Sequence, residues 1–443
     1  MNNKFIEYRE KYPDFIYDSF SYSIDENLNI DFHYVIPGLE EFNHKIIIPR
    51  EYIDISYDKE YLEYLIFNIG MIEVINYIKC TCSKNIIINA GYIDIDGINF
   101  FKKMYFKGLG ELLYRNNIDV SIDALFNFIC NCEEKELPTN NYCGRGNLIC
   151  VGGGKDSCVS LEILKNEKNN SCLVINPKDV NIECCRVAGY KDKDIIRVER
   201  IIDKKILDIN NKGFLNGHVP FSSVVAFISY LVAYLSGKEN IILSNESSAN
   251  EVTVLGTDVN HQYSKTYEAE NDFRSYMSNI NYFSLLRGLS EFNIAKMFSH
   301  YDKYHHVFKS CNLGSKSIPW KWCCNCPKCL FIFVILSPFL SIDKLISIFG
   351  ENLYEREDLL DTFKEIIGYS DNKPFECVGT YEEARYAVSL VIEKSSELPY
   401  LLKYYKDNYE LYLDGSKIEK YNEENNLDDY YDELVRKELD KYV

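Results

Sequence analysis

The stretch of this chain best suited to chemistry is a glycine-rich loop that runs into charged residues. It consists of Gly152, Gly153, Gly154, Lys155, Asp156 and Ser157. The apolar run 148–151 predicts a strand before the loop, and the apolar spacing over 158–164 predicts a helix after it. Glycines let backbone amides approach an anion closely, and a helix start adds free N–H groups and the positive end of its dipole. The pattern therefore predicts a phosphate-binding loop. A glycine-rich turn without a ligand is the alternative.

The loop differs from two common phosphate-binding patterns. A Walker loop has four residues between its first glycine and a Gly-Lys-Ser/Thr, and none follows here. A dinucleotide fingerprint has a glycine where this chain has Ser157. The remaining pattern, Gly-Gly-Gly-Lys-Asp-Ser, resembles the pyrophosphate loop of the ATP pyrophosphatase (PP-loop) superfamily, although many of those loops have serine at the position of Gly152. The resemblance implies an enzyme that splits ATP into AMP and pyrophosphate, usually to adenylate an oxygen of its substrate.

Charged residues in and near the loop fit such ATP chemistry. The loop amides and Lys155 are expected to stabilise the charge that develops on pyrophosphate. Asp156 is a candidate ligand of Mg²⁺, which prefers hard oxygen donors and nucleotide phosphates. Glu246, which ends a Ser-Asn-Glu sequence after a predicted strand, is a second candidate. We therefore assign Gly152–Ser157 and Glu246 to the binding of ATP and Mg²⁺.

Four cysteines have the spacing of a metal site. Cys323, Cys326 and Cys329 form a C-x2-C-x2-C pattern, and Cys311 lies upstream. Zn²⁺ prefers four tetrahedral ligands and is well served by closely spaced thiolates, and four sulfurs leave no open position. The pattern predicts structural zinc, with Cys324 left over; a reduced cluster that only packs and an iron–sulfur cluster are the alternatives. The spacing also resembles the zinc site of 7-cyano-7-deazaguanine synthase, another PP-loop enzyme.

The composition limits the partners and the compartment. The chain has 443 residues, a net charge of −18 and a pI near 5.0, which argues against a nucleic-acid groove. The beginning of the chain has no charged-then-apolar signal pattern, and the uncharged stretch 219–237 contains several serines and tyrosines and is expected to be a buried helix rather than a membrane span. Sixteen cysteines without a secretion signal indicate the reducing cytoplasm rather than a disulfide framework.

The elements that must position these residues follow an α/β pattern. From residue 147 onward, apolar runs alternate with helical patterns, which predicts a doubly wound parallel sheet with helices on both faces. The predicted strands are 148–151, 171–176, 194–199, 240–245 and 282–286, and the clearest helix is 220–236. Ligands of such sheets bind beyond the carboxyl ends of the strands. The glycine loop and Ser244–Glu246 both stand at strand ends, so we expect them to face one site.

The rest of the chain is expected to flank this sheet. An N-terminal α+β module is predicted over residues 1–135, with a hairpin over 15–36, a strand over 45–49 and helices over 61–78 and 100–114. A linker rich in asparagine and glycine follows over 133–147. We therefore predict a PP-loop domain over 147–310 and a zinc-containing helical region over 311–443.

Several further stretches resemble one family. They are Ser244–Asn250, Val259–Thr266, Tyr282–Glu291, Lys309–Asn312, Trp322–Cys329, Ser337–Phe339 and Lys373–Glu383. Together they are similar to the UDP-N-acetyl-α-D-muramoyl-L-alanyl-L-glutamate epimerase family over residues 145–390, with one departure at Gly288, where proline is expected. The resemblance implies ATP- and Mg²⁺-dependent inversion of the terminal L-glutamate of a nucleotide-linked peptidoglycan precursor.

The reaction implied by this resemblance explains why an epimerase would contain an ATP-cleaving loop. The α-proton beside an ionised carboxylate is very weakly acidic, and an acyl-adenylate removes that charge. Inversion also needs a base on one face of the α-carbon and an acid on the other. We expect His261 and Cys377 to be this pair, because an imidazole titrates in the right range and a thiol does so if its pKa is lowered.

Other roles remain open for these residues. A structural histidine and a buried cysteine are the alternatives for His261 and Cys377. The cations Lys265, Arg287 and Lys373 are expected to clamp carboxylates or phosphates, Arg287 as part of the nucleotide site, and they could equally be solvated or paired. A synthase that adenylates a carboxylate to form an amide or nitrile is the second functional hypothesis, and a nucleotide-binding sensor or scaffold is the third.

Overall fold

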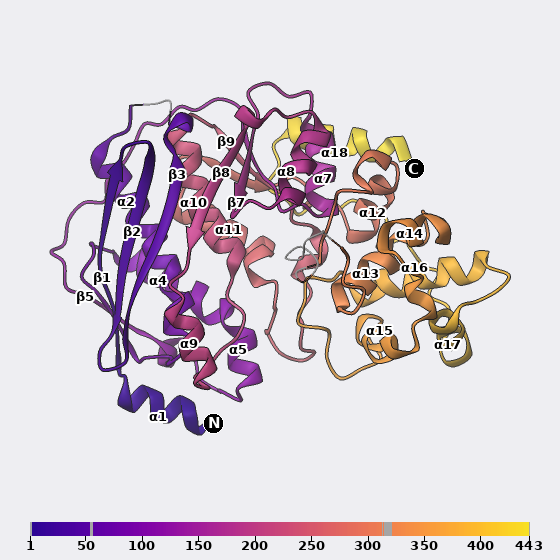
Figure 1. Ribbon diagram of the computed structural model, residues 1–443, viewed down its shortest axis with the longest axis horizontal. Helices are drawn as coiled ribbons and strands as arrows, with labels where there is room; N and C mark the ends of the chain where they lie inside the picture. Colours follow the sequence, from indigo (N-terminus) through magenta and orange to yellow (C-terminus); the bar gives the residue numbers. More distant parts are fainter. Residues whose placement is uncertain (1, 54–55, 312, 314–320, 443) are drawn as a thin grey trace.

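One mixed sheet runs through the molecule and carries both halves of the chain (Figure 1). The computed structural model describes residues 2–53, 56–311, 313 and 321–442. In these residues the sheet has ten strands in the order β10-β9-β6-β7-β8-β3-β2-β1-β4-β5. The strands are β1 (Asp14–Ile24), β2 (Asn27–Ile36), β3 (Glu40–Pro49), β4 (Asn85–Ile88), β5 (Asn127–Cys130), β6 (Asn147–Cys150), β7 (Ser171–Ile175), β8 (Ile195–Ile201), β9 (Asn240–Leu243) and β10 (Asn281–Ser284).

Helices cover this sheet and extend beyond it. They are α1 (Asn3–Lys11), α2 (Lys59–Glu73), α3 (Ile75–Ile78), α4 (Ile95–Gly108), α5 (Gly110–Arg115), α6 (Ile122–Leu125), α7 (Lys155–Leu164), α8 (Asp179–Ala188), α9 (Lys205–Asn211), α10 (Phe221–Leu235), α11 (Tyr267–Tyr276), α12 (Glu291–Ser299), α13 (Pro327–Leu336), α14 (Ile342–Phe349), α15 (Leu360–Ile366), α16 (Tyr381–Lys394), α17 (Tyr400–Asn408) and α18 (Asp429–Leu439). In the described parts of the chain, no helix is both long and apolar enough to cross a membrane.

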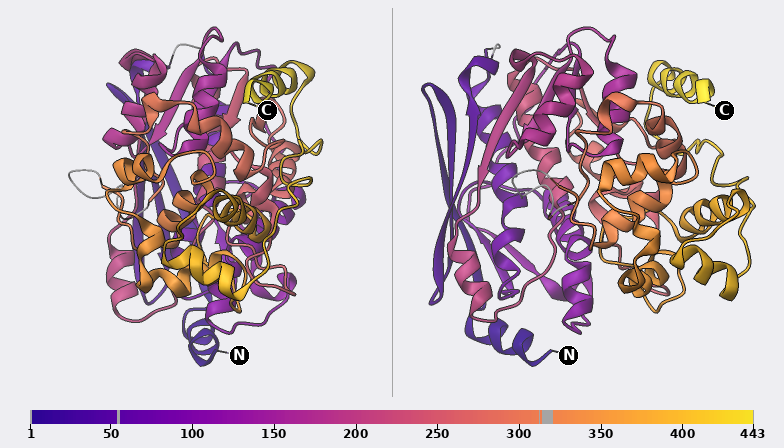
Figure 2. Two further views of the ribbon diagram at one scale, coloured as in Figure 1. Left: turned by 90° about the vertical axis from the view of Figure 1, so that its right-hand side faces the viewer. Right: turned by 45° about the vertical axis from the view of Figure 1, so that its right-hand side comes forward.

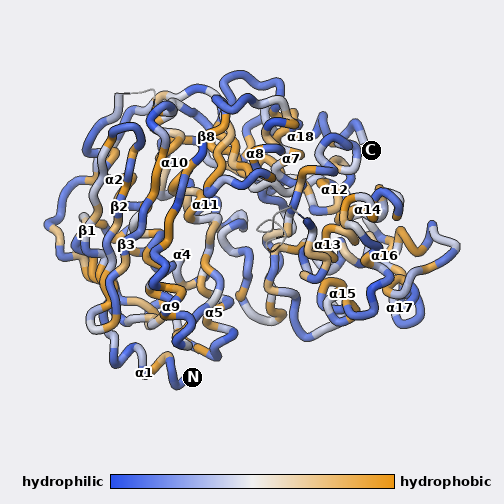
Figure 3. The backbone as a smooth tube through the Cα atoms, viewed as in Figure 1, coloured by the Kyte–Doolittle hydropathy of each residue, from blue (hydrophilic) through white to orange (hydrophobic). Residues whose placement is uncertain are grey.

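The half formed by β6 to β10 is parallel throughout, as predicted. Counted along the chain, its strands stand in the order 3-2-1-4-5, so the winding direction reverses between β6 and β9. Successive side chains enter two different cores: Leu148 packs on the α10 side of the sheet, and Ile149 packs on the side of α7 and α12. The 15-residue helix α10 is buried along nearly its whole length, which confirms a buried helix over 220–236. Its mainly apolar residues give it much orange colour in Figure 3.

The first half adds an antiparallel layer to the same sheet. The hairpin predicted over 15–36 is present as β1 and β2, and β3 completes a three-stranded meander. The strand β3 begins at Glu40, five residues before the predicted strand, because it pairs with β2 along its whole length. Its other edge pairs antiparallel with β8, from Lys45 opposite Ile201 to Ile47 opposite Glu199. Residues 1–135 therefore share one sheet with the parallel half instead of forming a sheet of their own.

A buried ion pair fastens this junction. Arg200 on β8 donates to both carboxylate oxygens of Glu73 on α2, at 2.6 and 2.5 Å, and His44 on β3 lies 3.4 Å from the same carboxylate. Burial opposes ionisation of Glu73, but Arg200 and His44 outweigh it and lower the pKa of Glu73 to about 2. Loss of Arg200 alone would deprive the buried Glu73 carboxylate of its main cation, and breaking a buried ion pair in this way costs about 3–5 kcal/mol in other proteins.

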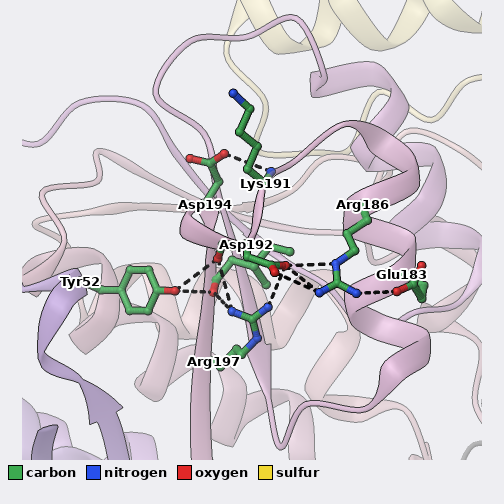
Figure 4. Close-up of polar contacts among 8 residues, drawn as sticks. Tyr52, Glu183, Arg186, Lys191, Asp192, Asp194 and Arg197 are labelled. Atoms are coloured by element: carbon green, nitrogen blue, oxygen red, sulfur yellow. Dashed lines mark hydrogen bonds and ion pairs between the residues drawn. The ribbon is translucent and has the colours of Figure 1, made fainter.

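The other end of β8 is tied by exposed polar contacts. The Tyr52 hydroxyl, which follows β3 in the chain, donates to the Ile195 carbonyl at 2.9 Å. Close by, Arg186 and Arg197 converge on the Asp192 carboxylate (Figure 4). These charges are largely solvent-exposed, so this cluster is expected to contribute little to the stability of the junction.

The last third of the chain forms a helical layer on the α7–α12 side, far from β1 and β2 (Figure 2). The tail then returns, and α18 packs against α7. A Cβ atom on Gly288 would lie 2.1 Å from the ring of Tyr421, a residue of this tail, and the Asn422 amide donates to the Gly288 carbonyl at 2.8 Å. Glycine rather than proline therefore stands at position 288 because the returning tail occupies the space of a side chain.

Candidate active site

The glycine loop lies at the carboxyl end of β6, beside the point where the strand order reverses. Gly153 has a φ of +81°, which glycine adopts without strain, and its carbonyl is fixed by the Lys309 amide at 2.9 Å. The Ser157 hydroxyl accepts from the Gly153 amide at 3.1 Å and donates to the Gly154 carbonyl at 3.0 Å. A Cβ atom on Gly152 would meet no atom within 4 Å. The loop is thus rigid at its base and open at Gly152.

Lys155 begins α7 and is fully buried between two acids. Its ammonium donates to the carboxylates of Asp156 and Glu291. Burial opposes the charged form of Lys155, but these two carboxylates raise the pKa of its ammonium above the usual value. The predicted contact of Lys155 with pyrophosphate stays a prediction, because in this structure its hydrogen bonds go to protein acids.

Three carboxylates converge next to this lysine. The nearest oxygens of Asp156, Glu246 and Glu291 all lie within 4.8 Å of one another. Burial raises the pKa of Glu291 to about 7; the Lys155 ammonium opposes the shift, and the Asp156 and Glu246 carboxylates add to it. Such a group of hard oxygens could hold a divalent cation. It brings together Asp156 and Glu246, which the sequence assigned to Mg²⁺.

Glu291 was missed by the sequence reasoning. It opens α12, directly after the Ser290 cap, on the chain segment that follows β10. Its position after a strand next to β9 was the signal that could have found it, since that strand end faces the same edge of the sheet. Its backbone amide donates to Glu383 at 2.8 Å, and the Ser248 hydroxyl donates to the same carboxylate oxygen at 2.6 Å.

Arg287 is completely buried behind these acids. Its guanidinium donates to the carbonyls of Glu246 and Lys265, both at 2.7 Å, and to the Glu270 carboxylate at 3.0 Å. The arginine therefore fixes the backbone of two loops that carry site residues. Its predicted contact with the nucleotide stays a prediction, and these contacts favour a supporting role.

His261 and Cys377 lie together, although 116 residues separate them along the chain. Their side chains form a hydrogen bond. Burial opposes ionisation of Cys377, but the Lys265 ammonium, the hydrogen bond from His261 and the Lys328 ammonium lower the pKa of the thiol to about 6. Burial likewise opposes protonation of His261, and its contacts with Cys377 and then Glu111 raise its pKa to about 9. At neutral pH the pair is a thiolate beside an imidazolium.

Two lysines connect this pair with the carboxylates. Burial disfavours the ammonium of Lys265, but the charges of Cys377, Glu246 and Asp156 raise its pKa above the usual value. Lys328 donates to the Cys377 carbonyl and also lowers the pKa of Asp156 through its charge. The loop, the carboxylates and the thiolate therefore belong to one centre. The ammonium of Lys373 pairs with the carboxylate of Glu251.

The four predicted metal cysteines also come together. The Sγ atoms of Cys323 and Cys329 lie 3.5 Å apart, those of Cys326 and Cys329 3.5 Å, and those of Cys326 and Cys311 3.8 Å. Four sulfurs around one tetrahedral zinc ion would be about 3.8 Å apart. Cys324 points elsewhere, with Sγ 3.3 Å from the Phe349 carbonyl. The donor set fits a tetrahedral metal ion that binds thiolates.

A short segment joins the cysteine cluster to the glycine loop. Cys311 follows Lys309, whose amide holds the Gly153 carbonyl, and Ser310, whose hydroxyl lies 2.9 Å from where a Cβ atom of Gly154 would stand. Among the described residues, no carboxylate pairs with the Lys309 ammonium, which is buried near the Trp322 ring. The sequence did not single out Lys309 for a role; the segment places it beside the loop.

Comparisons with known proteins cover most of the chain. Residues 7–285 match the family description "MurL N-terminal domain", and residues 307–404 match "MurL C-terminal domain". A protein of Xanthomonas oryzae pv. oryzae named UDP-N-acetyl-alpha-D-muramoyl-L-alanyl-L-glutamate epimerase is 31% identical over 338 residues, which are 73% of this chain and 74% of the relative. Proteins of the same name from a Micromonospora strain and from Salinispora tropica are 35% and 33% identical, over 66% and 72% of this chain and 66% and 71% of their own. No solved structure matches.

The thiolate state of Cys377 is directly measurable. The absorbance of the protein at 240 nm, minus that of a Cys377→Ser variant, should rise with pH around a midpoint near 6. A Lys265→Met variant should move this midpoint upward by at least about one pH unit, because it removes the strongest stabilising charge. A Cys143→Ser variant, which alters an exposed thiol, is the control and should leave the difference unchanged. A midpoint at the ordinary thiol value of about 8.5 would contradict this electrostatic assignment.

Proposed function

This chain belongs to the UDP-N-acetyl-α-D-muramoyl-L-alanyl-L-glutamate epimerase family, and we propose that it inverts the terminal L-glutamate of that substrate, or of a related peptidyl glutamate, to D-glutamate. Epimerases are isomerases, and the chain is an enzyme of this class. The observation that carries the proposal is the thiolate–imidazolium pair of Cys377 and His261 beside a glycine loop and three carboxylates. This arrangement supplies both a proton acceptor and a place for ATP.

We propose that ATP first activates the substrate. An oxygen of the glutamate carboxylate attacks the α-phosphorus, the bond from that phosphorus to pyrophosphate breaks, and an acyl-adenylate forms. The carboxylate thereby loses its negative charge, so the neighbouring α-proton becomes removable. The open tip at Gly152 and the amides of the loop would bind the phosphates, and Lys309, whose backbone amide holds the Gly153 carbonyl, would bring a cation near them. The 3-2-1-4-5 strand order and the loop support a PP-loop fold for this half.

The second part of the proposal is proton exchange at the α-carbon. The Cys377 thiolate accepts the α-proton, and the His261 imidazolium donates a proton to the opposite face once the substrate lies between the two side chains. The pair is then a thiol and a neutral imidazole, and exchange with solvent restores it. Hydrolysis of the acyl-adenylate finally releases AMP and the inverted glutamyl residue.

Two metal ions complete the proposal. Asp156, Glu246 and Glu291 would hold Mg²⁺, which supplies positive charge to the phosphates of ATP. Cys311, Cys323, Cys326 and Cys329 would hold structural Zn²⁺, since four thiolates leave no position for a substrate. The proposed use of ATP and the sixteen cysteines of the chain support action in the reducing cytoplasm.

The epimerase is tested by isotope exchange in single variants. With UDP-MurNAc-L-Ala-L-Glu, ATP and Mg²⁺ in D₂O, the wild-type protein should release AMP and place deuterium at the glutamyl α-carbon, as followed by NMR. Cys377→Ala should lower inversion by about 10²–10⁴-fold and leave AMP formation within about tenfold, since acid–base groups contribute rate factors of this size. His261→Asn should still exchange the α-proton but fail to invert. Cys143→Ser is the matched control.

Two results of this experiment would contradict the proposal. Wild-type inversion without AMP release would remove adenylation, and unimpaired inversion in either variant would remove that residue from the proton exchange. AMP formation that requires ammonia and leaves the α-proton in place would instead favour the synthase hypothesis.

The metal assignment predicts a link between zinc and ATP binding. A Cys326→Ser variant should lose the zinc that elemental analysis finds in the wild-type protein, about one ion per chain, because three thiolates hold the metal less tightly. It should also bind ATP more weakly in calorimetry, because Lys309 and Ser310 connect Cys311 to the glycine loop. Cys324→Ser should change neither property. Equal zinc content in the two variants would overturn this assignment.

A further inference from the structure

The ring of His261 is held on one side by a residue of the first half of the chain. Its Nδ1 atom lies 2.6 Å from Oε2 of Glu111, a residue of α5 that is 150 positions earlier. Both side chains are 9% exposed, so the contact is largely shielded from water. Because Glu111 engages Nδ1, the other ring nitrogen, Nε2, is left for Cys377.

Glu111 is itself fixed from two directions. Its second oxygen, Oε1, lies 3.0 Å from Nε of Arg115, one turn along α5. The Arg115 guanidinium also stacks over the ring of Phe375, at 4.6 Å, and Phe375 is two residues from Cys377. The carboxylate is therefore placed by the same contacts that dock the Cys377 loop onto the first half.

The ring of His218 completes this environment. It lies 4.1 Å from the ring of His261, centroid to centroid. Burial lowers the pKa of His218 to about 4, and the charge of His261 adds to the shift while Glu111 opposes it. His218 thus stays neutral at neutral pH. The other charges that face the His261–Cys377 pair are Lys79 behind His218 and the two lysines beside the thiolate, Lys265 and Lys328.

We propose that Glu111 is a positioning residue of the epimerase, which completes a Glu111–His261–Cys377 triad by orienting the imidazole. Its carboxylate is also a counter-charge for the ring when the ring is protonated. The inference rests on the proposed function and deepens it. The same logic operates where a buried carboxylate orients a catalytic histidine for a neighbouring nucleophile. Here the partner of the histidine is Cys377, the proposed base that removes a proton from carbon. The charges alternate in sign from Glu111 through His261 and Cys377 to Lys265.

The triad also gives the first half of the chain a part in the reaction. Glu111 and Arg115 come from α5, and His218 comes from the segment before α10. None of the three has a local sequence motif that marks it as part of a site. The loop that carries Cys377 belongs to the last third of the chain, so the pair becomes ordered only when both parts are folded together.

The test uses a charge-removing variant with an acid at the same position as rescue. Glu111→Gln should raise the midpoint of the Cys377 absorbance titration by about one pH unit, because the imidazolium loses its counter-charge. It should also lower kcat by about 10²–10⁴-fold, as loss of an orienting carboxylate does elsewhere, and leave KM within about threefold of the wild-type value. The acidic limb of the pH–rate profile should move to higher pH together with the midpoint. Glu111→Asp should restore part of both. Glu63→Gln, an exposed acid of α2, is the control.

The titration needs no substrate, so it separates this inference from the epimerase itself. An unchanged thiolate midpoint and an unchanged kcat in Glu111→Gln would overturn the triad, whereas a shifted midpoint in a protein that performs no inversion would overturn only the proposed function. Glu111, His218 and His261 could alternatively bind a metal ion, and loss of one bound divalent metal in Glu111→Gln would also overturn the triad.

A measurement on the wild-type protein covers the case in which the glutamine variant does not fold. The ¹⁵N shifts of the His261 ring, assigned by their absence in His261→Asn, should be those of a doubly protonated imidazolium at pH 7. A neutral ring at that pH would overturn the proposal.

Discussion

Balanced burial of charge is the constraint on which the rest of this structure depends. The side chain of Lys155 is completely buried, and its charged ammonium is stabilised there by the carboxylates of Asp156 and Glu291. Lys265 stands in the same relation to the Cys377 thiolate. Moving a single ion into a protein interior costs several kcal/mol even after relaxation, so each of these groups requires its partner. The fully buried Arg287 donates to the backbone carbonyls of Glu246 and Lys265 and thereby holds the two loops that carry these charged residues.

The continuous sheet is the second requirement, because it fixes the two halves of the chain against each other. The β3–β8 pairing and the buried Arg200–Glu73 pair hold the first half beside the parallel strands. Only in that arrangement does Glu111 reach His261. The glycine loop, in turn, is braced by the segment that enters the cysteine cluster. The proposed ATP-binding loop and the proposed proton-exchange pair thereby lie in one centre, although their residues come from three separate parts of the chain.

Much of the parallel half could be predicted from the sequence, because its signals are local. The glycine loop lies between the end of a strand and the start of a helix. The five predicted strands of this half begin and end within two residues of the observed strands. The cysteine cluster was also predictable, since three of its members lie within seven residues. Lys309 and Glu111 were not, because each reaches the site through tertiary contacts that leave no pattern in the sequence. Glu291 was missed although it follows a predicted strand end. The β3–β8 pairing was not predictable either. It consists of three residue pairs, and each of the two strands also pairs with another strand on its opposite edge.

The central claim is that this single centre uses ATP to make an α-proton removable. Deuterium incorporation at the glutamyl α-carbon, measured by NMR in D₂O with ATP, without nucleotide and with an ATP analogue whose α,β-bridge is a methylene group, tests it most directly. The account predicts incorporation with ATP alone, since the analogue binds in the loop but cannot release pyrophosphate. Incorporation at an equal rate without nucleotide would contradict it, because the Cys377–His261 pair would then act on an ordinary carboxylate.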